Sequence, residues 1–107
     1  MNKDLKIRKM ERTEIVLEGR KGEIQLFSDD HKAGKMDISV IGQKLTVYHT
    51  EVNTEYEGKG FAKILLERLV SYARENDLKI VPLCPYVHAQ FKRHPEEYND
   101  VWLKEVL

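Results

Sequence analysis

Residues 56–62, with the sequence Tyr-Glu-Gly-Lys-Gly-Phe-Ala, join a strand-like segment to a helix-like segment. The preceding residues 45–52 are rich in β-branched and aromatic side chains, which favour a strand. Residues 61–73 repeat apolar side chains with the period of an amphipathic helix. A helix N-terminus carries unpaired N–H groups and partial positive charge, so it favours a phosphate, and glycines let the anion approach. The stretch therefore predicts an anion or cofactor site.

The residues before this stretch predict an antiparallel β-meander. Strand-like runs of apolar or alternating residues occur at 15–17, 23–27, 36–40 and 45–52. Turn-forming residues at 29–31 and at Gly42-Gln43 separate them, and connections this short favour antiparallel pairing. We interpret the mostly polar residues 1–14 as a loose N-terminal arm or a short extra element.

The residues after the helix predict a second strand that runs parallel to residues 45–52. Asn76-Asp77 is a plausible helix stop, and the apolar residues 79–83 follow it. A strand–helix–strand unit implies a right-handed crossover and parallel pairing. Pro82 cannot donate to the ladder, so we expect the two strands to separate there and open a cleft beside the glycine turn. Residues 86–92 predict a short C-terminal helix that ends near residues 94–95.

Composition limits the classes of function. The 107 residues suggest one domain with a modest core, spanning 1–107. Lys+Arg and Asp+Glu are both 18, and no basic stripe is visible, so nucleic acid and anionic membrane are not expected partners. No run approaches the ~20 apolar residues of a membrane span. The one cysteine, Cys84, suggests a reducing, cytoplasmic setting. No His or Cys spacing indicates a metal site.

The motifs in the second half carry a family resemblance. Residues 57–62 resemble the acetyl-CoA motif of the GNAT superfamily of N-acetyltransferases: Gly60 and Ala62 match, whereas Glu57 replaces the usual Gln or Arg. The chain is more similar to the short YjdJ-type acetyltransferase-like subfamily. The shared motifs are His-Thr-Glu-Val at 49–52, Val-Pro-Leu-Cys-Pro at 81–85 and Arg-His-Pro at 93–95. The resemblance covers roughly residues 23–102.

The resemblance implies a reduced GNAT fold of the α/β (α+β) class that holds acetyl-CoA (coenzyme A) between two splayed parallel strands. Backbone N–H groups of the glycine turn would bind the pyrophosphate, and the strand end would pair with the pantetheine amides. The cofactor-binding residues implied are Thr50, Glu51, Val52, Gly58, Lys59, Gly60, Phe61, Ala62 and Lys63. The function implied is an N-acetyltransferase that moves an acetyl group from acetyl-CoA to an unidentified amine.

A non-catalytic acyl-CoA-binding or protein-interaction module on the same fold is the alternative, because fold does not determine function. The chain is shorter than ordinary GNAT enzymes, and we expect it to lack the N-terminal helices that usually form an acceptor-binding wall. The acceptor and the oligomeric state therefore do not follow from the sequence. A P-loop is disfavoured, because no Gly-Lys-Ser/Thr ending occurs.

The catalytic candidates are Cys84, Glu51 and Tyr86. Cys84 is either an inert buried thiol or an acyl-accepting nucleophile at the cleft. Strict alternation places His49 and Glu51 on the same strand face as Val47. We favour a structural role for His49 and leave Glu51 open as a base. The resemblance implies that Tyr86 gives a proton to the leaving thiolate, as a tyrosine after this strand does in many GNAT enzymes.

Overall fold

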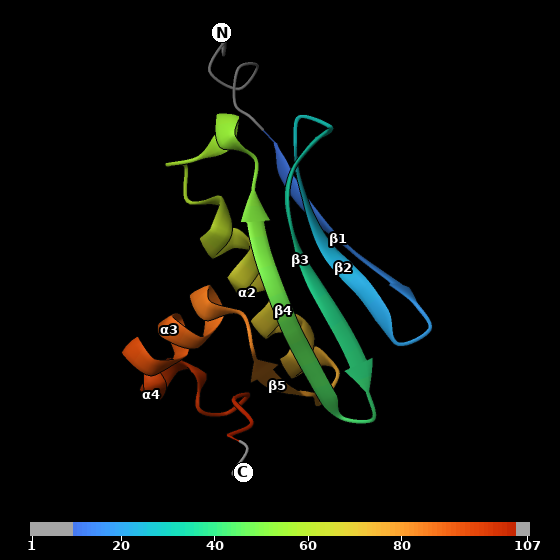
Figure 1. Ribbon diagram of the computed structural model, residues 1–107, viewed down its shortest axis with the longest axis vertical. Helices are drawn as coiled ribbons and strands as arrows, with labels where there is room; N and C mark the ends of the chain where they lie inside the picture. Colours follow the sequence, from blue (N-terminus) through green and yellow to red (C-terminus); the bar gives the residue numbers. More distant parts are fainter. Residues whose placement is uncertain (1–9, 105–107) are drawn as a thin grey trace, which may run out of the picture.

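The structure is a computed structural model in which residues 10–104 are described. Its strands and helices follow one another along the chain as β1 (Glu11–Glu18), β2 (Lys21–Ser28), β3 (His31–Ile41), β4 (Lys44–Val52), the 3-10 helix η1 (Thr54–Tyr56), α2 (Phe61–Glu75), β5 (Lys79–Pro82), α3 (Pro85–Arg93) and α4 (Pro95–Tyr98). Figure 1 shows the strands as one sheet with the helices beside and behind it.

The five strands form one sheet in the order β1-β2-β3-β4-β5. The pairs from β1 to β4 are antiparallel, and β4 pairs with β5 in parallel. This arrangement confirms the predicted meander followed by a strand–helix–strand unit. The turns also lie where the sequence placed them: Asp29 and Asp30 link β2 to β3 with positive φ, and Gly42 links β3 to β4.

The N-terminal boundary differs from the expectation for residues 1–14. Strand β1 begins at Glu11, which lies opposite Ser28 of β2, so residues 11–14 belong to the sheet. Residues 1–9 lie outside the described part. For residues 11–14 the structure agrees with the second interpretation, an extra element, and not with a loose arm. Their charged side chains are tolerated because β1 lies at one end of the strand order, where it forms an edge strand.

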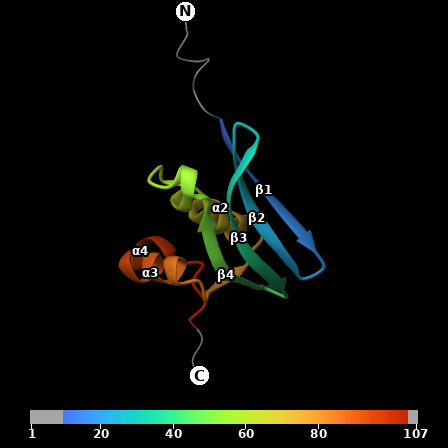
Figure 2. The ribbon, with the colours of Figure 1, turned by 45° about the horizontal axis from the view of Figure 1, so that its top comes forward.

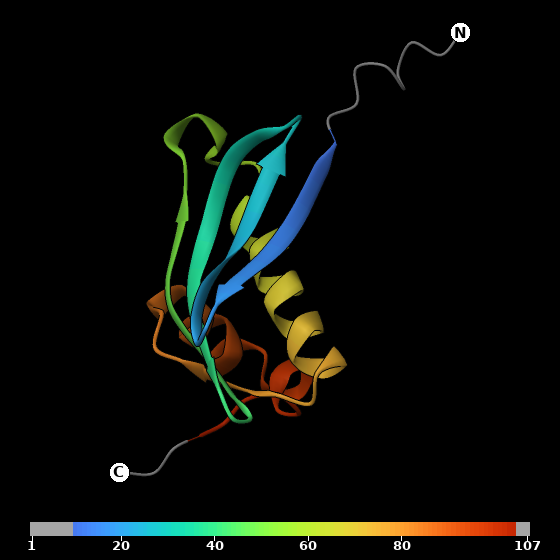
Figure 3. The same ribbon diagram turned by 90° about the vertical axis from the view of Figure 1, so that its right-hand side faces the viewer.

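Helix α2 packs along one face of β2, β3 and β4, as the side view in Figure 3 shows. Alternate strand residues such as Ile24, Met36 and Ile38 are buried there, together with Leu65 and Leu69 of the helix. Burying one such side chain contributes about 1.5–3 kcal/mol. The opposite face carries Val16, Glu23, Gln25 and Asp37, which alternate with the buried positions, and we call it the outer face.

The C-terminal residues complete the core next to β5. Helices α3 and α4 lie side by side in Figures 1 and 2. The Ile80 N–H donates to the Val101 carbonyl, and Ile80 bridges Trp102 in parallel. Arg74 of α2 donates to both carboxylate oxygens of Asp100, at 2.8 and 3.0 Å, which ties this segment to the helix. Among residues 10–104, no helix has the length and apolar character that a membrane crossing requires.

Candidate functional site

The parallel strands β4 and β5 separate halfway along β4. Their register runs from Lys44 opposite Lys79 to Val47 opposite Pro82 and ends there, although β4 continues to Val52. The Val47 carbonyl accepts hydrogen bonds from the N–H groups of both Leu83 and Cys84, at 3.1 and 2.9 Å. The chain then turns away into α3. The splay therefore occurs at Pro82, where the sequence placed it, but the predicted reason was wrong. The N–H groups of Lys79 and Leu83 point to β4 and that of Ile80 points to Val101, so by alternation the nitrogen of Pro82 faces away from β4.

The separated end of β4 presents backbone groups toward the cleft. The Asn53 N–H donates to Ala33 of β3, at 2.7 Å. Hydrogen-bonding groups alternate in direction along an antiparallel strand, so those of Thr50 and Val52 point away from β3. Glu51 points its backbone groups toward β3, opposite Lys35. Of the three predicted strand residues, Thr50 and Val52 have the backbone orientation that an added extended chain requires.

The glycine turn lies between η1 and α2. Gly58 and Gly60 have φ of 80° and 78°, a left-handed conformation that disfavours side chains. A Cβ at either glycine would have nothing within 4 Å, so the backbone there is open to a bulky group. The rings of Tyr56 and Phe61 stack at 5.6 Å and fix the two sides of the turn.

The first turn of α2 offers backbone N–H donors, and no acidic side chain in that turn competes with a ligand for them. Its N-cap, Gly60, supplies no side-chain hydrogen bond, and the first turn holds no acidic residue. The first three N–H groups of an α-helix have no intrahelical acceptor, and here they belong to Phe61, Ala62 and Lys63. Lys59 and Lys63 are exposed beside them. This donor set and the open glycine backbone fit a pyrophosphate.

Cys84 lies at the other side of the splay, at the N-cap of α3. Its side chain is buried, with 2% of the residue exposed, and its sulfur lies 3.1 Å from the Thr50 hydroxyl oxygen. The structure thus brings the side chain of Cys84 next to the end of β4. The thiol packs inside the core instead of facing solvent.

His49 and Glu51 lie on the opposite face of β4 from the one expected. The β3–β4 register shifts between Asp37 and Ile38: Ile38 faces Val47, whereas Asp37 faces His49, so Tyr48 is one extra residue. Such a β-bulge reverses the alternation of all following side chains. His49 and Glu51 therefore point to the outer face, with the His49 Nε2 3.1 Å from a Glu51 carboxylate oxygen. Sequence alternation did not reveal this, because nothing in residues 45–52 marks a bulge.

The bulge also places the Thr50 side chain on the core face. Thr50 lies opposite the buried Met36, which explains how its hydroxyl reaches Cys84. The sequence predicted Thr50 for its backbone alone. The Tyr48 hydroxyl, on the extra residue, lies 2.7 Å from that of Ser39.

Tyr86, in the first turn of α3, is half-buried. Burial raises the pKa of its phenol above the ordinary value, and the nearby Cys84 and Glu67 raise it further. A tyrosine in this setting keeps its proton at neutral pH, which is the state that a proton donor requires. Within residues 10–104, no three His, Cys, Asp or Glu side chains form a group that could hold a metal ion.

Comparison with known families identifies the class of protein. Residues 23–101 match the family model of the GCN5-related N-acetyl-transferases, so the chain belongs to this family. No curated protein matches the chain in sequence. The particular YjdJ-type subfamily is not distinguished by these comparisons.

Solved structures share the fold. A GCN5-like putative N-acetyltransferase from Staphylococcus aureus is 29% identical, with a TM-score of 0.60 over 87% of this chain and 90% of that one. A predicted acetyltransferase with acetyl-CoA from Clostridium acetobutylicum is 21% identical, with a TM-score of 0.55 over 81% of this chain and 64% of that one. The ribosomal-protein-S18-alanine N-acetyltransferase of Escherichia coli is 19% identical, with a TM-score of 0.58 over 62% of this chain. The chain spans only 43% of that structure.

Proposed function

We propose that this chain binds acetyl-CoA between β4 and β5 and transfers the acetyl group to an amine. The observation that carries the proposal is the combination of the splay with the glycine turn. A strand edge that is free beyond Val47 continues, through η1, into a helix N-terminus whose glycine backbone is open. Family membership over residues 23–101 supports the same activity.

Different residues of the chain bind different parts of acetyl-CoA. The N–H groups of Phe61, Ala62 and Lys63 hold the pyrophosphate, and Lys59 adds positive charge. The backbone of Thr50 and Val52 pairs with an extended, amide-bearing chain in the way that a neighbouring strand would. We assign Glu51 to the outer face, because its backbone points to β3 and its side chain contacts His49.

Bound acetyl-CoA would supply an acetyl thioester at the splay. A backbone N–H of β4 near Val52 stabilises the negative charge that develops on the carbonyl oxygen. Tyr86 gives its proton to the departing thiolate, which the raised pKa of its phenol permits. The burial of Cys84 favours direct attack by the amine over a covalent acetyl-cysteine, because a thiol with 2% of its residue exposed cannot meet a thioester without movement.

The competing function is a binding module that holds acyl-CoA without transferring the group. The chain's coverage of only 43% of the Escherichia coli enzyme structure favours keeping this alternative. Calorimetry with acetyl-CoA, paired with a thiol-release assay across primary amines, separates the two. Saturable binding with amine-dependent thiol release supports the transferase. Binding without release across the amines supports the module, and absence of binding overturns both.

A further inference from the structure

Strand β1 ends the strand order, so only one of its two edges is paired among residues 10–104. Figure 3 shows it at the outside of the sheet. The Met10 carbonyl accepts a hydrogen bond from the Asp29 N–H at 3.1 Å, so its backbone oxygen points toward β2. Backbone groups alternate in direction along a strand, so the odd-numbered residues from 11 to 17 point theirs away from the sheet. This row of donors and acceptors is a template for another strand.

The edge of β1 lacks several features that protect edge strands from further pairing. Its pairing with β2 runs without a register shift from Glu11 to Glu18, so no bulge twists the edge away. The strand contains neither proline nor lysine. Ile15 is half-buried, and Val16 and Leu17 are 41% and 37% exposed. A regular edge with exposed apolar side chains favours association with another strand.

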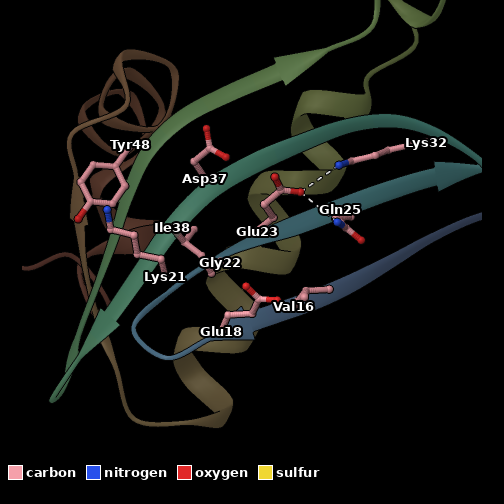
Figure 4. A pocket seen from close by; sticks show the side chains of 10 residues that line it. All are labelled: Val16, Glu18, Lys21, Gly22, Glu23, Gln25, Lys32, Asp37, Ile38 and Tyr48. Carbon is pink, nitrogen blue, oxygen red and sulfur yellow. Dashed lines mark hydrogen bonds and ion pairs between the residues drawn. The ribbon is translucent and has the colours of Figure 1, made fainter.

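The two faces of β1 differ in chemistry. Ile15 lies opposite the buried Ile24 of β2, so the odd-numbered residues face the side of the sheet that carries α2. The even-numbered residues from 12 to 18 therefore lie on the outer face. Figure 4 shows two of them, Val16 and Glu18, rising from β1 beside a hollow of about 780 Å³. A strand added to this edge would meet mostly charged side chains on the outer face and mostly apolar ones on the other.

The sequence of β1 is complementary to a second copy of itself in one antiparallel register. A two-fold axis perpendicular to the sheet makes the two edges antiparallel, as in a symmetric dimer. When this axis passes between the two Ile15 residues, Arg12 of each copy lies opposite Glu18 of the other, and Thr13 lies opposite Leu17. The outward-pointing backbone groups then face one another. Directly opposed unlike charges stabilise a strand pair, so the register gains two such pairs.

The neighbouring symmetric registers are less favourable. An axis at Glu14 places the two Glu14 carboxylates opposite each other, and an axis at Val16 places Glu14 opposite Glu18 twice. Like charges directly opposed destabilise a strand pair. An axis at Thr13 pairs Arg12 with Glu14 but covers a shorter stretch of β1. The charges of β1 therefore favour the register centred on Ile15 instead of opposing association altogether.

Arg12 can contact a second carboxylate without losing the contacts that it already makes. One of its terminal nitrogens contacts Glu14, and the other lies 3.6 Å from Asp30. Its guanidinium also lies over the ring of Phe27, 4.3 Å from the ring centre, which holds it on the outer face. A guanidinium has five N–H donors, and 47% of the Arg12 side chain is exposed. Within residues 10–104, Glu18 has no ion-pair partner.

We propose that β1 is a dimerisation edge at which two copies of this chain join their five-stranded sheets into one continuous sheet. Strands β4 and β5 lie at the opposite end of the strand order, so the proposed acetyl-CoA sites stay open. The inference therefore does not depend on the proposed function. One strand from each copy is fewer than the roughly 20–30 residues a side of a standard interface, so the dimer is weak and depends on concentration.

Analytical ultracentrifugation of the full chain tests the dimer and its register. We expect a reversible monomer–dimer equilibrium with a dissociation constant below about 1 mM. Arg12→Glu and Glu18→Arg should each weaken the dimer about 10-fold, because two attractive pairs become repulsive. The double variant that carries both substitutions should restore it, because the pairs are again of opposite charge. Arg93→Glu, at the exposed end of α3, makes the same change in net charge and should have no effect.

Three outcomes of this experiment would overturn the proposal. They are a monomer at concentrations up to about 1 mM, equal weakening by Arg12→Glu and Arg93→Glu, and a double variant as weak as the single variants.

Amide hydrogen exchange locates the interface in the unsubstituted protein. The amides of Glu14 and Val16 point toward β2 and should be protected at every concentration. Those of Thr13, Ile15 and Leu17 should gain about 10-fold protection between dilute and concentrated samples. A mixture of labelled and unlabelled protein should show an intermolecular contact between the Hα atoms of Glu14 and Val16, which this register places at closely spaced positions.

The exchange experiment also separates the dimer from other occupants of the edge. Protection of the odd-numbered amides that is equal at all concentrations would show that the chain's own residues cover the edge. Concentration-dependent protection elsewhere would show that another surface associates. Either result, or a dimer without the Glu14–Val16 contact, overturns the assigned interface.

Discussion

The hydroxyl oxygen of Thr50 lies 3.1 Å from the sulfur of Cys84, although the two residues are 34 positions apart in the chain. This contact joins the free end of β4 to the start of α3, across the point where β4 and β5 separate. It exists because the bulge at Tyr48 turns Thr50 toward the core. The same bulge turns His49 and Glu51 to the outer face. The one extra residue, Tyr48, therefore decides which side chains at the end of β4 face the core and which face outward.

Replacing Gly60 by valine should weaken acetyl-CoA binding. The substitution places a branched side chain in open space beside the proposed pyrophosphate site. It also forces a left-handed conformation that costs about 1–2 kcal/mol in folding free energy. Gly42→Val in the β3–β4 turn, where φ is 59° and a Cβ would meet nothing, carries the same backbone cost away from the site. Calorimetry should show at least a 10-fold loss of affinity for Gly60→Val and none for Gly42→Val. Equal affinities would remove the proposed site.

Cys84→Ala should retain acetyl transfer. The thiol is buried, so its loss leaves a small cavity, and we expect a destabilisation of about 1–2 kcal/mol by chemical denaturation. The folded protein should react slowly with iodoacetamide, and bound acetyl-CoA should change that rate little. An acetyl adduct on Cys84 in mass spectra, together with abolished transfer in Cys84→Ala, would establish the covalent route instead.

Tyr86→Phe should reduce the rate of acetyl transfer without changing acetyl-CoA affinity. Removing a general acid costs about 100-fold in rate when the leaving group needs a proton. The pKa of the Tyr86 phenol is raised, so this group should cause no alkaline loss of activity below the ordinary range of tyrosine. Tyr72→Phe, a partly buried tyrosine on α2, is the matched control. Identical rates for the two variants would exclude Tyr86 as the acid.

Acid should destabilise the protein partly through Glu23. A hydrogen bond from Gln25, followed by one from Lys32, lowers the pKa of this carboxyl from 4.5 to about 2. The unfolded chain therefore binds a proton at higher pH than the folded one, so this stabilisation is present above pH 4.5 and is lost as the pH falls toward about 2. Solvent screening limits it to about 1 kcal/mol.

Glu23→Gln should accordingly lower the unfolding free energy at neutral pH and flatten its decline in acid. Gln25→Ala should move the loss of stability to higher pH, because it removes the largest cause of the shift. Urea unfolding at a series of pH values measures both effects. An unchanged acid dependence in Glu23→Gln would show that other carboxylates dominate it.

Local sequence determined the elements and much of the cleft. Helix α2 follows from the spacing of Phe61, Leu65 and Leu69, and its beginning follows from the glycine turn, because side-chain period and backbone freedom are properties of adjacent residues. The sequence predicted the position of the splay at Pro82 but gave the wrong cause, because the nitrogen of Pro82 faces away from β4 in the packed sheet. The parallel pairing followed from the helix between the two strands, because a helical crossover returns the chain to the same end of the sheet.

Tertiary structure alone decided which way the end of β4 faces. Strict alternation put His49 with Val47, but pairing with β3 inserts Tyr48 as an extra residue and reverses that order. A bulge depends on the register of two strands, and no single strand encodes it. Likewise, Cys84 is buried against Thr50, which is distant in the chain. The same is true across the sheet, where Val16 lies opposite Glu23, Glu23 opposite Asp37 and Asp37 opposite His49. Only the packed sheet brings these residues together.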